Sequence, residues 1–376
     1  FMGEQVGGFD TTTLDFFDPL AKDASTSSLS SPFGTDAIIG SLNEGELSVA
    51  ERDVSGRAFA SYFSGNIIQI CPVGALTAAS YRFRARPFDL VSTASVTEHD
   101  ASGSAIRQDM RRGEVVRRMS GNDPEVNEEW ITDKDRFAFE WDKVDRLTYP
   151  LVREDGELVP TSWSDALDRV REGLESAGSS IGFLTGGRLT FEDAWAWSKF
   201  ARTVVGSDSI DFRSRSSSEE ERSFLASFVA GSGLDVTYSD LESAGQVLLV
   251  ALEPEDECGA MFLRLRKGTR KSGLKVATVA PFTSNGSRKM NARLLHAAPG
   301  AEPGVVDTIK AGGAYADVAE ALSGGIILVG ERAAQTPGLL SSVVALAERT
   351  GARLAWVPRR SGDRAAIEAG LLPGLL

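Results

Sequence analysis

Residues 246–281 read QVLLVALEPEDECGAMFLRLRKGTRKSGLKVATVAP, and this stretch decides the fold. An apolar run at 247–252 is followed by an amphipathic stretch at 260–271 and by a second, mainly apolar run at 274–281. Short apolar strands joined by a helix are typical of a parallel sheet that is covered on both faces. The stretch therefore predicts a β–α–β unit inside an α/β domain.

The same alternation continues on both sides of this stretch. Downstream, we predict helices over 314–324 and 339–351 and strands over 325–330 and 353–358. Upstream, a helix over 162–176 precedes a strand with a glycine turn over 180–187, and Thr190 and Asp193 begin a further helix with a capping box. The upstream helix places these residues on one apolar face: Ala166, Leu167, Val170 and Leu174. Residues 149–376 are therefore predicted to form an α/β domain with parallel sheets flanked by helices.

Two smaller parts precede this domain. Residues 89–148 carry strand-like runs, and AIRQDMRRGEVVRRM (105–119) predicts a hairpin that turns at Arg111, Arg112 and Gly113. Residues 1–88 begin with an irregular segment rich in Ser and Thr, which is typical of a surface loop. We expect three parts, over 1–88, 89–148 and 149–376, with the second being a small β-rich domain.

Composition excludes some classes of function. The 376 residues include 53 acidic and 40 basic side chains, and the net charge of −13 argues against nucleic acid as a partner. No stretch approaches the roughly 20 apolar residues of a membrane span, and the N-terminus lacks the features of a secretory signal. We expect a soluble protein on the cytoplasmic side, without direct membrane insertion.

Cysteine is scarce, which limits metal chemistry. The chain has two cysteines, Cys71 in GNIIQICPVGALT (65–77) and Cys258, so neither a disulfide framework nor a four-thiolate site can be built from it. A Cys-Pro step commonly closes the ligand run of an iron–sulfur cluster, but such a cluster needs four thiolates. Cys258 is interpreted as an incidental small residue and is left unassigned.

For the other candidate binding residues, a purely structural role is at least as good an interpretation as a binding role. Gly186 and Gly187 follow a strand and could bind a phosphate or a dinucleotide, although a plain turn is favoured because the pattern is not GxGxxG. The acidic residues Glu253, Glu255, Asp256 and Glu257 follow an apolar strand, where α/β ligand sites form, yet an acidic loop is favoured.

Histidine and arginine give weaker signals. His99 and His296 lack a second ligand at metal spacing, and both are interpreted as loop residues. Arginines gather at 82–86 and 111–118, where they could pair with acidic neighbours in a complex, contact a phosphate-bearing cofactor, or form a solvated surface.

Three longer sequence segments, one of which contains Cys71, resemble a known protein family. The segments GNIIQICPVGALTAASYRFRARPFDL (65–90), GEVVRRMSGNDPEVNEEWITDKDRFAFEW (113–141) and FLTGGRLTFEDAWAWSKFAR (183–202) closely resemble the G subunit, the large iron–sulfur subunit of respiratory NADH:quinone oxidoreductase (complex I). The resemblance covers nearly the whole chain. It implies the fold of the molybdopterin oxidoreductase superfamily, whose α/β body agrees with the alternation above.

The resemblance assigns Cys71 as the last ligand of a 4Fe-4S cluster. The other three ligands would lie upstream in a CxxCxxC run, and Phe1 resembles the phenylalanine that follows this run. Residues 1–88 would then be the remnant of the cluster domain, and further clusters would lie upstream. Pro72 lacks an N–H and Gly74 allows close backbone approach, while backbone donors to the cluster would come from Val73 to Ala75.

A second cluster of the family is expected to be lost. Many members carry an extra four-iron site with spacing CxxCxxxC and a later cysteine in CDKG; the matching positions here are Thr97, Asp100, Ser104 and Thr132. Hydroxyl and carboxylate groups do not assemble such a cluster. Residues 89–148 would then serve packing, and Lys134, which matches a lysine between cluster and pterin in molybdenum-dependent relatives, receives no redox role.

The resemblance implies a subunit of a proton-pumping NADH:quinone oxidoreductase that passes electrons from NADH and flavin towards quinone. This portion would be mainly scaffold and inactive alone, and no molybdenum is expected. Its partners would be other peripheral-arm subunits, including the flavin-bearing NADH-binding subunit, on the cytoplasmic side of the membrane. A molybdopterin-dependent oxidoreductase of the formate dehydrogenase kind and a redox-inactive structural module remain as alternatives.

Overall fold

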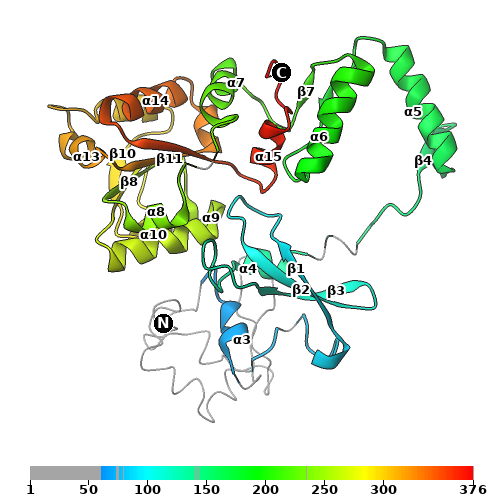
Figure 1. Cartoon of the computed structure of the whole chain (residues 1–376), viewed down its shortest axis with the longest axis horizontal. Coiled ribbons are helices and arrows are strands. Elements are labelled where there is room, and N and C mark those ends of the chain that lie inside the picture. Colours follow the sequence, from blue (N-terminus) through cyan, green and yellow to red (C-terminus); the bar gives the residue numbers. More distant parts are fainter. Residues whose placement is uncertain are drawn as a thin grey trace. The chain divides into compact units, whose positions relative to one another are not determined.

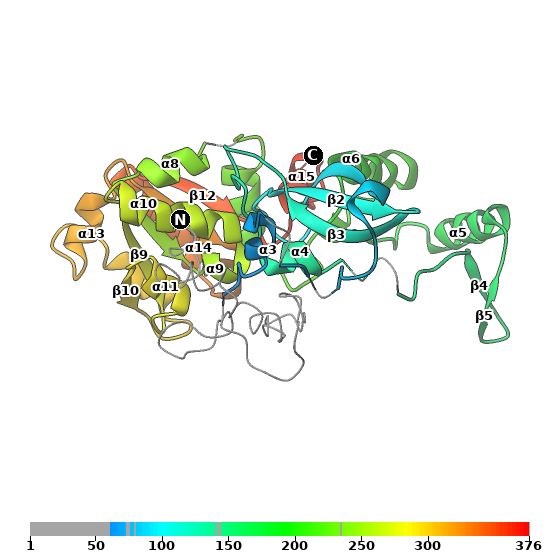
Figure 2. The same ribbon diagram turned by 90° about the horizontal axis from the view of Figure 1, so that it is seen from below.

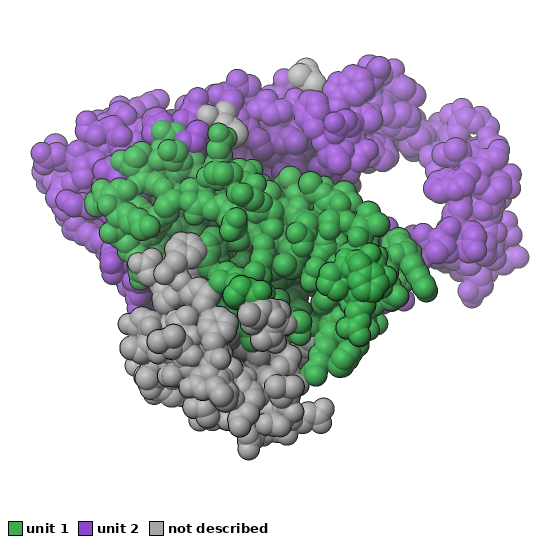
Figure 3. All heavy atoms as spheres, turned by 60° about the horizontal axis from the view of Figure 1, so that its bottom comes forward, with its two compact units in different colours: residues 1–140, 238–243, 253–273 green, residues 141–237, 244–252, 274–376 purple. Residues whose placement is uncertain are grey.

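The computed structural model describes residues 61–72, 76–78, 80–139, 141, 144–233 and 235–375. The chain divides into two compact units, which Figure 3 distinguishes by colour. Unit 1 consists of residues 1–140, 238–243 and 253–273, and unit 2 consists of residues 141–237, 244–252 and 274–376. Unit 2 contains the parallel sheet and unit 1 a small antiparallel sheet, so the predicted fold class is confirmed.

Unit 2 is built on a five-stranded parallel sheet (Figure 1). Its strands are β8 (Gln246–Val250), β9 (Lys275–Ala280), β10 (Arg293–His296), β11 (Ile326–Gly330) and β12 (Arg353–Val357). Their spatial order is β10-β9-β8-β11-β12, with every neighbouring pair parallel. Strands β8 and β11 are buried at every residue, which explains why these strands are almost entirely apolar in sequence.

Two helices of unit 2 pack on this sheet: α12 (Glu302–Asp307) contacts β9, and α14 (Leu339–Thr350) contacts β11 and β12. Unit 2 also contains α11 (Asn285–Lys289), α13 (Ala316–Ala321) and α15 (Asp363–Glu368), and α15 contacts α6. Helix α14 packs against β11 and β12 (Figure 1) and buries Leu339, Leu340, Val343 and Leu346. It ends at Gly351, whose φ of 72° is a left-handed conformation that stops a helix and suits glycine.

A second part of unit 2 precedes the sheet in sequence. Strand β6 (Phe183–Leu184) pairs in parallel with β7 (Ile210–Asp211), and α6 (Phe191–Lys199) continues as a π-helix over Phe200–Val205. The predicted cap is present, because the Thr190 side chain accepts a hydrogen bond from the Asp193 N–H. Helix α7 (Glu219–Phe224) also continues as a π-helix, over Leu225–Val229.

The first elements of unit 2 are the hairpin β4 (Leu151–Glu154) and β5 (Glu157–Pro160) and helix α5 (Trp163–Ala177). The predicted apolar face of α5 forms, but the described residues do not bury it: Leu167 is 60% exposed and Val170 is 55% exposed. The sequence pattern therefore predicted the helix correctly, although packing within the described residues does not explain its apolar face.

Unit 1 contains a three-stranded antiparallel sheet of β1 (Val91–Val96), β2 (Ala105–Arg111) and β3 (Glu114–Ser120). Arg112 and Gly113 both have positive φ, as a tight hairpin turn requires, so the predicted hairpin is confirmed. Helices α3 (Asn66–Ile70) and α4 (Asp133–Phe137) pack against β3 (Figure 2), and a 3-10 helix spans Pro87–Asp89.

Three helices that follow later in the chain also belong to unit 1: α8 (Tyr238–Ser243), α9 (Pro254–Glu257) and α10 (Gly259–Lys271). Arg264 of α10 explains this, because its guanidinium donates to the backbone oxygens of Val126 (2.9 Å) and Pro124 (2.6 Å). The domain boundaries at 88/89 and 148/149 stay predictions. The predicted division placed α8, α9 and α10 in the α/β domain, whereas in the structure they belong to unit 1. Among the described residues, no helix is long and apolar enough to cross a membrane.

Candidate metal centre

Cys71 lies at the end of a short helix that is anchored to a distant segment. The helix α3 ends at Cys71, whose N–H donates to the Ile67 oxygen at 3.0 Å, and the Cys71 side chain is buried. The Asn66 amide donates to the Ile131 oxygen at 2.7 Å, and the Ile131 N–H donates back at 3.2 Å. Because both groups of the amide are used, α3 has a fixed position against the segment before α4.

A buried carboxylate provides the second anchor of α3. Asp133 accepts hydrogen bonds from the Ser64 hydroxyl at 2.5 Å and from the Gly65 N–H at 2.7 Å. Burial raises the pKa of Asp133 to about 6, while these hydrogen bonds and the Arg136 charge act in the opposite direction. Arg136 is also buried, which lowers its pKa to about 10, and it donates to the Asn66 side-chain oxygen at 2.8 Å.

Cys71 offers one of the four thiolates that a 4Fe-4S cluster needs. Cys71 and Cys258 are the thiols of the chain, and both are unpaired and buried. A 4Fe-4S cluster at Cys71 would therefore need three thiolates from outside the described residues. The predicted contributions of Phe1 and of Val73, Gly74 and Ala75 also lie outside the described residues.

Cys258 has an environment that suppresses thiol chemistry. Its Sγ lies 3.3 Å from the Ser102 hydroxyl oxygen. Burial, together with the nearby Asp100 charge, raises the pKa of this thiol to about 12. A thiol that stays protonated is a poor nucleophile and a poor metal ligand.

The structure brings together the positions where the sequence predicts lost ligands. The side chains of Thr97, Asp100, Ser104 and Thr132 are all buried. The Thr97 N–H donates to the Ser104 oxygen at 3.0 Å, which closes the loop that carries three of the positions. These four positions therefore belong to one buried cluster of polar groups.

Asp135 joins this cluster, although sequence reasoning did not single it out. Its carboxylate accepts hydrogen bonds from the hydroxyls of Thr97 (2.5 Å) and Thr132 (2.7 Å), and from the Thr132 N–H (3.2 Å). The sequence did contain a sign of this role for Asp135. The family motif CDKG corresponds here to Thr132, Asp133, Lys134 and Asp135. An aspartate thus stands where that motif has glycine.

The remaining charges of this cluster are paired. Asp100 accepts a hydrogen bond from the Ser102 N–H at 2.8 Å, and its carboxylate lies 3.8 Å from the Lys134 ammonium. Burial raises the pKa of Asp100 to about 6, with a further contribution from the Asp135 charge. Three hydroxyls and a carboxylate do not fit the four thiolates that a 4Fe-4S cluster needs.

The glycine turn of unit 2 does not fit a phosphate. The Asp363 carboxylate packs directly on Gly187, since a Cβ on that glycine would lie 1.7 Å from the Asp363 Oδ1 atom. Gly187 also accepts a hydrogen bond from the Gly362 N–H at 3.0 Å. A buried carboxylate at this turn would repel an anion, so the structural interpretation of the turn is the better one.

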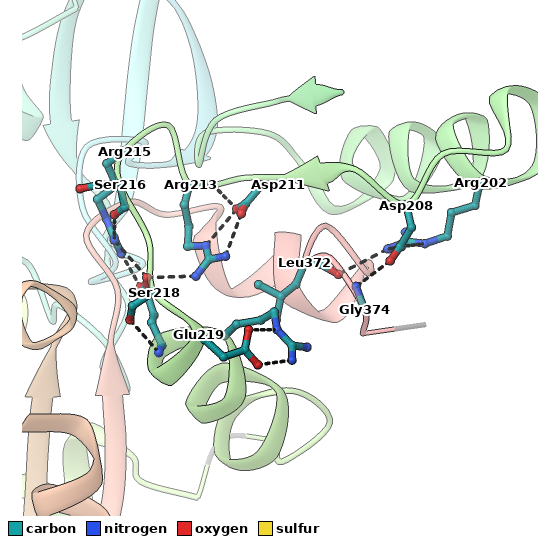
Figure 4. A network of polar contacts seen from close by, with 12 residues as sticks. Arg202, Asp208, Asp211, Arg213, Arg215, Ser216, Ser218, Glu219, Leu372 and Gly374 are labelled. Carbon is teal, nitrogen blue, oxygen red and sulfur yellow. Dashed lines mark hydrogen bonds and ion pairs between the residues drawn. The ribbon is translucent and has the colours of Figure 1, made fainter. Parts of the chain in front are cut away.

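An ion-pair network in unit 2 was missed by sequence reasoning (Figure 4). The buried Glu221 carboxylate accepts from Arg213 at 3.0 Å and from Arg215 at 2.5 Å, and Arg215 also donates to Glu331 at 2.5 Å. Arg213 pairs in addition with Asp211, at the end of β7. The run RSRSSSEEER (213–222) was the available signal. Cofactors of α/β folds bind at such strand ends, but these arginines are already neutralised by carboxylates.

The weaker candidates do not form a metal site. His296 ends strand β10, so the prediction of a loop there was wrong. The acidic run forms helix α9 with Glu255 and Glu257 buried, so the prediction of an acidic loop was also wrong. Burial lowers the pKa of His99, which lies 3.4 Å from the Glu98 carboxylate. Within the described part of the chain, no group of three or more His, Cys, Asp or Glu residues is arranged to hold a metal ion.

The two arginine clusters have different surroundings. Arg117 pairs with Asp109 at 2.6 Å, and Arg118 pairs with Glu98 at 3.1 Å. Arg82, Arg84 and Arg86 are exposed. The cluster at 111–118 is thus engaged partly by carboxylates of its own unit, whereas the cluster at 82–86 faces solvent.

Three protein families match successive parts of this chain. Residues 34–77 match the ferredoxin-like domain of NADH-quinone oxidoreductase subunit 3. Residues 90–140 match the 4Fe-4S domain described as NADH-ubiquinone oxidoreductase NDSU1/NuoG-like. Residues 146–346, more than half of the chain, match the molybdopterin oxidoreductase family.

Curated relatives agree with these matches. The chain is 56% identical over 323 residues to the G subunit of NADH-quinone oxidoreductase from Mycobacterium bovis, which covers 85% of this chain and 40% of the relative. It is 52% identical over 343 residues to the corresponding G subunit from Streptomyces coelicolor, covering 85% of this chain and 41% of the relative. The mitochondrial 78 kDa subunit of NADH-ubiquinone oxidoreductase from Neurospora crassa is 36% identical over 230 residues, covering 58% of this chain and 30% of the relative. The chain thus spans well under half the length of these relatives.

Proposed function

This chain belongs to the molybdopterin oxidoreductase family, and from that premise we propose that it forms part of the large iron–sulfur subunit of an NADH:quinone oxidoreductase. In this role it belongs to the peripheral arm, where electrons pass from NADH and flavin towards quinone. The bacterial relatives, which are named as G subunits of this enzyme, support the assignment. The chain spans 40% of the M. bovis relative, so the activity belongs to the whole subunit in its complex.

The observation that carries the proposal is the setting of Cys71. This buried thiol ends the anchored helix α3 and lies within the residues that match a ferredoxin-like domain. In the native polypeptide, Cys71 supplies one thiolate of a 4Fe-4S cluster, and the other three come from residues upstream. A bound cluster supplies one-electron transfer, and this chain's own contribution is to hold the ligand rigidly through Asn66 and Asp133.

Unit 2 acts as scaffold in this proposal. A molybdopterin-dependent reaction would need a site for an anionic pterin cofactor at the strand ends. There Glu221 and Glu331 neutralise Arg213 and Arg215, and Asp363 packs on the turn at Gly187. These contacts favour a structural role over the molybdopterin-dependent alternative.

The residues 90–140 keep the fold of a 4Fe-4S domain without its ligands. In this proposal the extra cluster is lost at Thr97, Asp100, Ser104 and Thr132, and Lys134 serves the ion pair with Asp100 instead of electron transfer. Electrons then reach quinone through the other clusters of the complex.

The proposed partners are other peripheral-arm subunits of complex I, including the flavin-bearing NADH-binding subunit. The proposed location is the cytoplasmic side of the membrane, held there by the complex. The names of the relatives, which are subunits of NADH-quinone and NADH-ubiquinone oxidoreductases, support partners within such a complex. The net charge of −13 disfavours nucleic acid as a further partner.

Isolation of the native complex tests the proposal. A tag on the native polypeptide should recover, from detergent-solubilised membranes, an assembly that oxidises NADH, reduces a soluble quinone and contains iron and flavin. A metal analysis of the same sample should find no stoichiometric molybdenum. Recovery of the polypeptide alone, without NADH oxidation or iron, would contradict the assignment and favour a redox-inactive module.

A further inference from the structure

Unit 1 carries a 4Fe-4S domain fold whose centre is occupied by protein groups. The two segments that meet there are the loop 97–104 between β1 and β2 and the start of α4. In an iron–sulfur domain the metal cluster joins such segments through thiolates. In unit 1 a side chain of the protein joins the loop 97–104 to the start of α4 instead.

We propose that the Asp135 carboxylate replaces an iron–sulfur cluster as the cross-link of this domain and excludes a cluster from it. Asp135 lies on α4, and one of its carboxylate oxygens accepts from Thr97, on the loop, at 2.5 Å, which joins the two segments. The other oxygen accepts from Thr132 at 2.7 Å in the capping box of α4, which fixes the orientation of the carboxylate. The hydroxyl donors stand at two of the positions expected to carry thiolates. Hydrogen bonds from buried donors to a carboxylate are among the stronger ones in proteins.

The space around Asp135 is closed on the other sides. The loop docks on α8 and on the start of α10, because the Tyr238 hydroxyl donates to the Ser102 oxygen at 2.8 Å and the Ala260 N–H donates to the Ser102 hydroxyl at 3.3 Å. A Cβ on Gly259 would lie 2.2 Å from the Thr132 methyl group, so α10 begins in direct contact with this residue. Hydrogen bonds and packing thus fix the loop without a metal.

This inference concerns unit 1 alone and does not rest on the proposed electron-transfer role. It makes Asp135, and not only the missing cysteines, the reason why the domain takes no cluster. Restoring the thiolates without removing the carboxylate should therefore fail.

Two variants of the 376-residue chain test this directly. The first carries Thr97→Cys, Asp100→Cys, Ser104→Cys and Thr132→Cys, and the second adds Asp135→Gly. Both are reconstituted anaerobically with ferrous iron and sulfide, and iron, sulfide and visible absorbance are compared with the unsubstituted chain. We expect about four additional iron atoms per chain in the second variant and none in the first. Equal iron uptake by both variants would overturn the exclusion, and so would the absence of iron from both.

Thermal unfolding tests the cross-link independently of any metal. Asp135→Ala in the otherwise unchanged chain leaves three buried donors without an acceptor, and we expect Tm to fall by about 5 °C or more. Asp168→Ala, at a position on α5 whose side chain is 61% exposed, is the matched control and should leave Tm nearly unchanged. Equal Tm values for the two variants would show that Asp135 is no cross-link.

Discussion

Asp133 offers the sharpest test of how the Cys71 helix is held. Asp133→Ala removes the acceptor of the Ser64 hydroxyl and of the Gly65 N–H, which lie at 2.5 and 2.7 Å. It also removes the stronger of the two carboxylate charges that act on the buried Arg136 guanidinium. Each unsatisfied buried donor costs about 1–3 kcal/mol, and the buried Arg136 guanidinium also loses a nearby opposite charge. Because these terms overlap, we expect the free energy of unfolding to fall by about 3–5 kcal/mol in total.

The assay is urea unfolding of the 376-residue chain, with hydrogen exchange of residues 64–71 measured on the same samples. The backbone amides of this segment should exchange faster in Asp133→Ala, because the anchor of α3 is lost. Asp168→Ala is again the exposed control. A loss below about 1 kcal/mol, with unchanged exchange of residues 64–71, would show that Asp133 does not anchor α3.

Two further predictions follow from burial and packing. Burial raises the pKa of Asp133 to about 6 from its ordinary value of 3.8. The folded state therefore binds the Asp133 proton more tightly than the unfolded state does. The stability that this proton contributes is fully present below about pH 4 and is lost as the pH rises through about 6. Asp133→Asn should flatten this decline in urea unfolding between pH 4 and 7, and an unchanged pH profile would contradict the assignment. Gly187→Ala places a Cβ 1.7 Å from the Asp363 Oδ1 atom, so we expect a loss of about 1–3 kcal/mol in thermal or urea unfolding. Gly173→Ala on α5, where a Cβ meets nothing within 4 Å, should be neutral or stabilising by up to about 1 kcal/mol, and equal effects at the two glycines would argue against the contact with Asp363.

The strands of the sheet could be predicted from the sequence because burial on both faces leaves a simple signal. β8, apart from Gln246, and β11 are apolar throughout and lie inside the sheet. β10, at the edge, spans Arg293–His296 with exposed residues at both ends, and its short, mixed pattern did not distinguish it from a loop. The acidic residues of α9 were wrongly predicted to form a loop, because composition does not reveal that Glu255 and Glu257 are buried.

The candidate site was predictable only where a motif marks it. Cys71 was found from the Cys-Pro step and the words around it, whereas its anchors Asn66 and Asp133 were not, because each contact spans more than 60 residues of sequence. Asp135 was visible as an aspartate in place of a glycine, but its meaning depends on hydrogen bonds to Thr97 and Thr132 that sequence spacing does not reveal. Long-range polar contacts of this kind carry no periodic signal.

Electron paramagnetic resonance of the native complex shows directly whether Cys71 is an iron–sulfur ligand. The spectrum of the NADH-reduced complex is compared for the unsubstituted polypeptide, Cys71→Ser and Cys258→Ser. Cys258 is the matched control, because it is also a buried cysteine but lies beside Ser102, where burial raises the pKa of its thiol. We predict that Cys71→Ser alone removes or shifts one 4Fe-4S signal and slows quinone reduction. An unchanged spectrum and rate in Cys71→Ser would contradict the account.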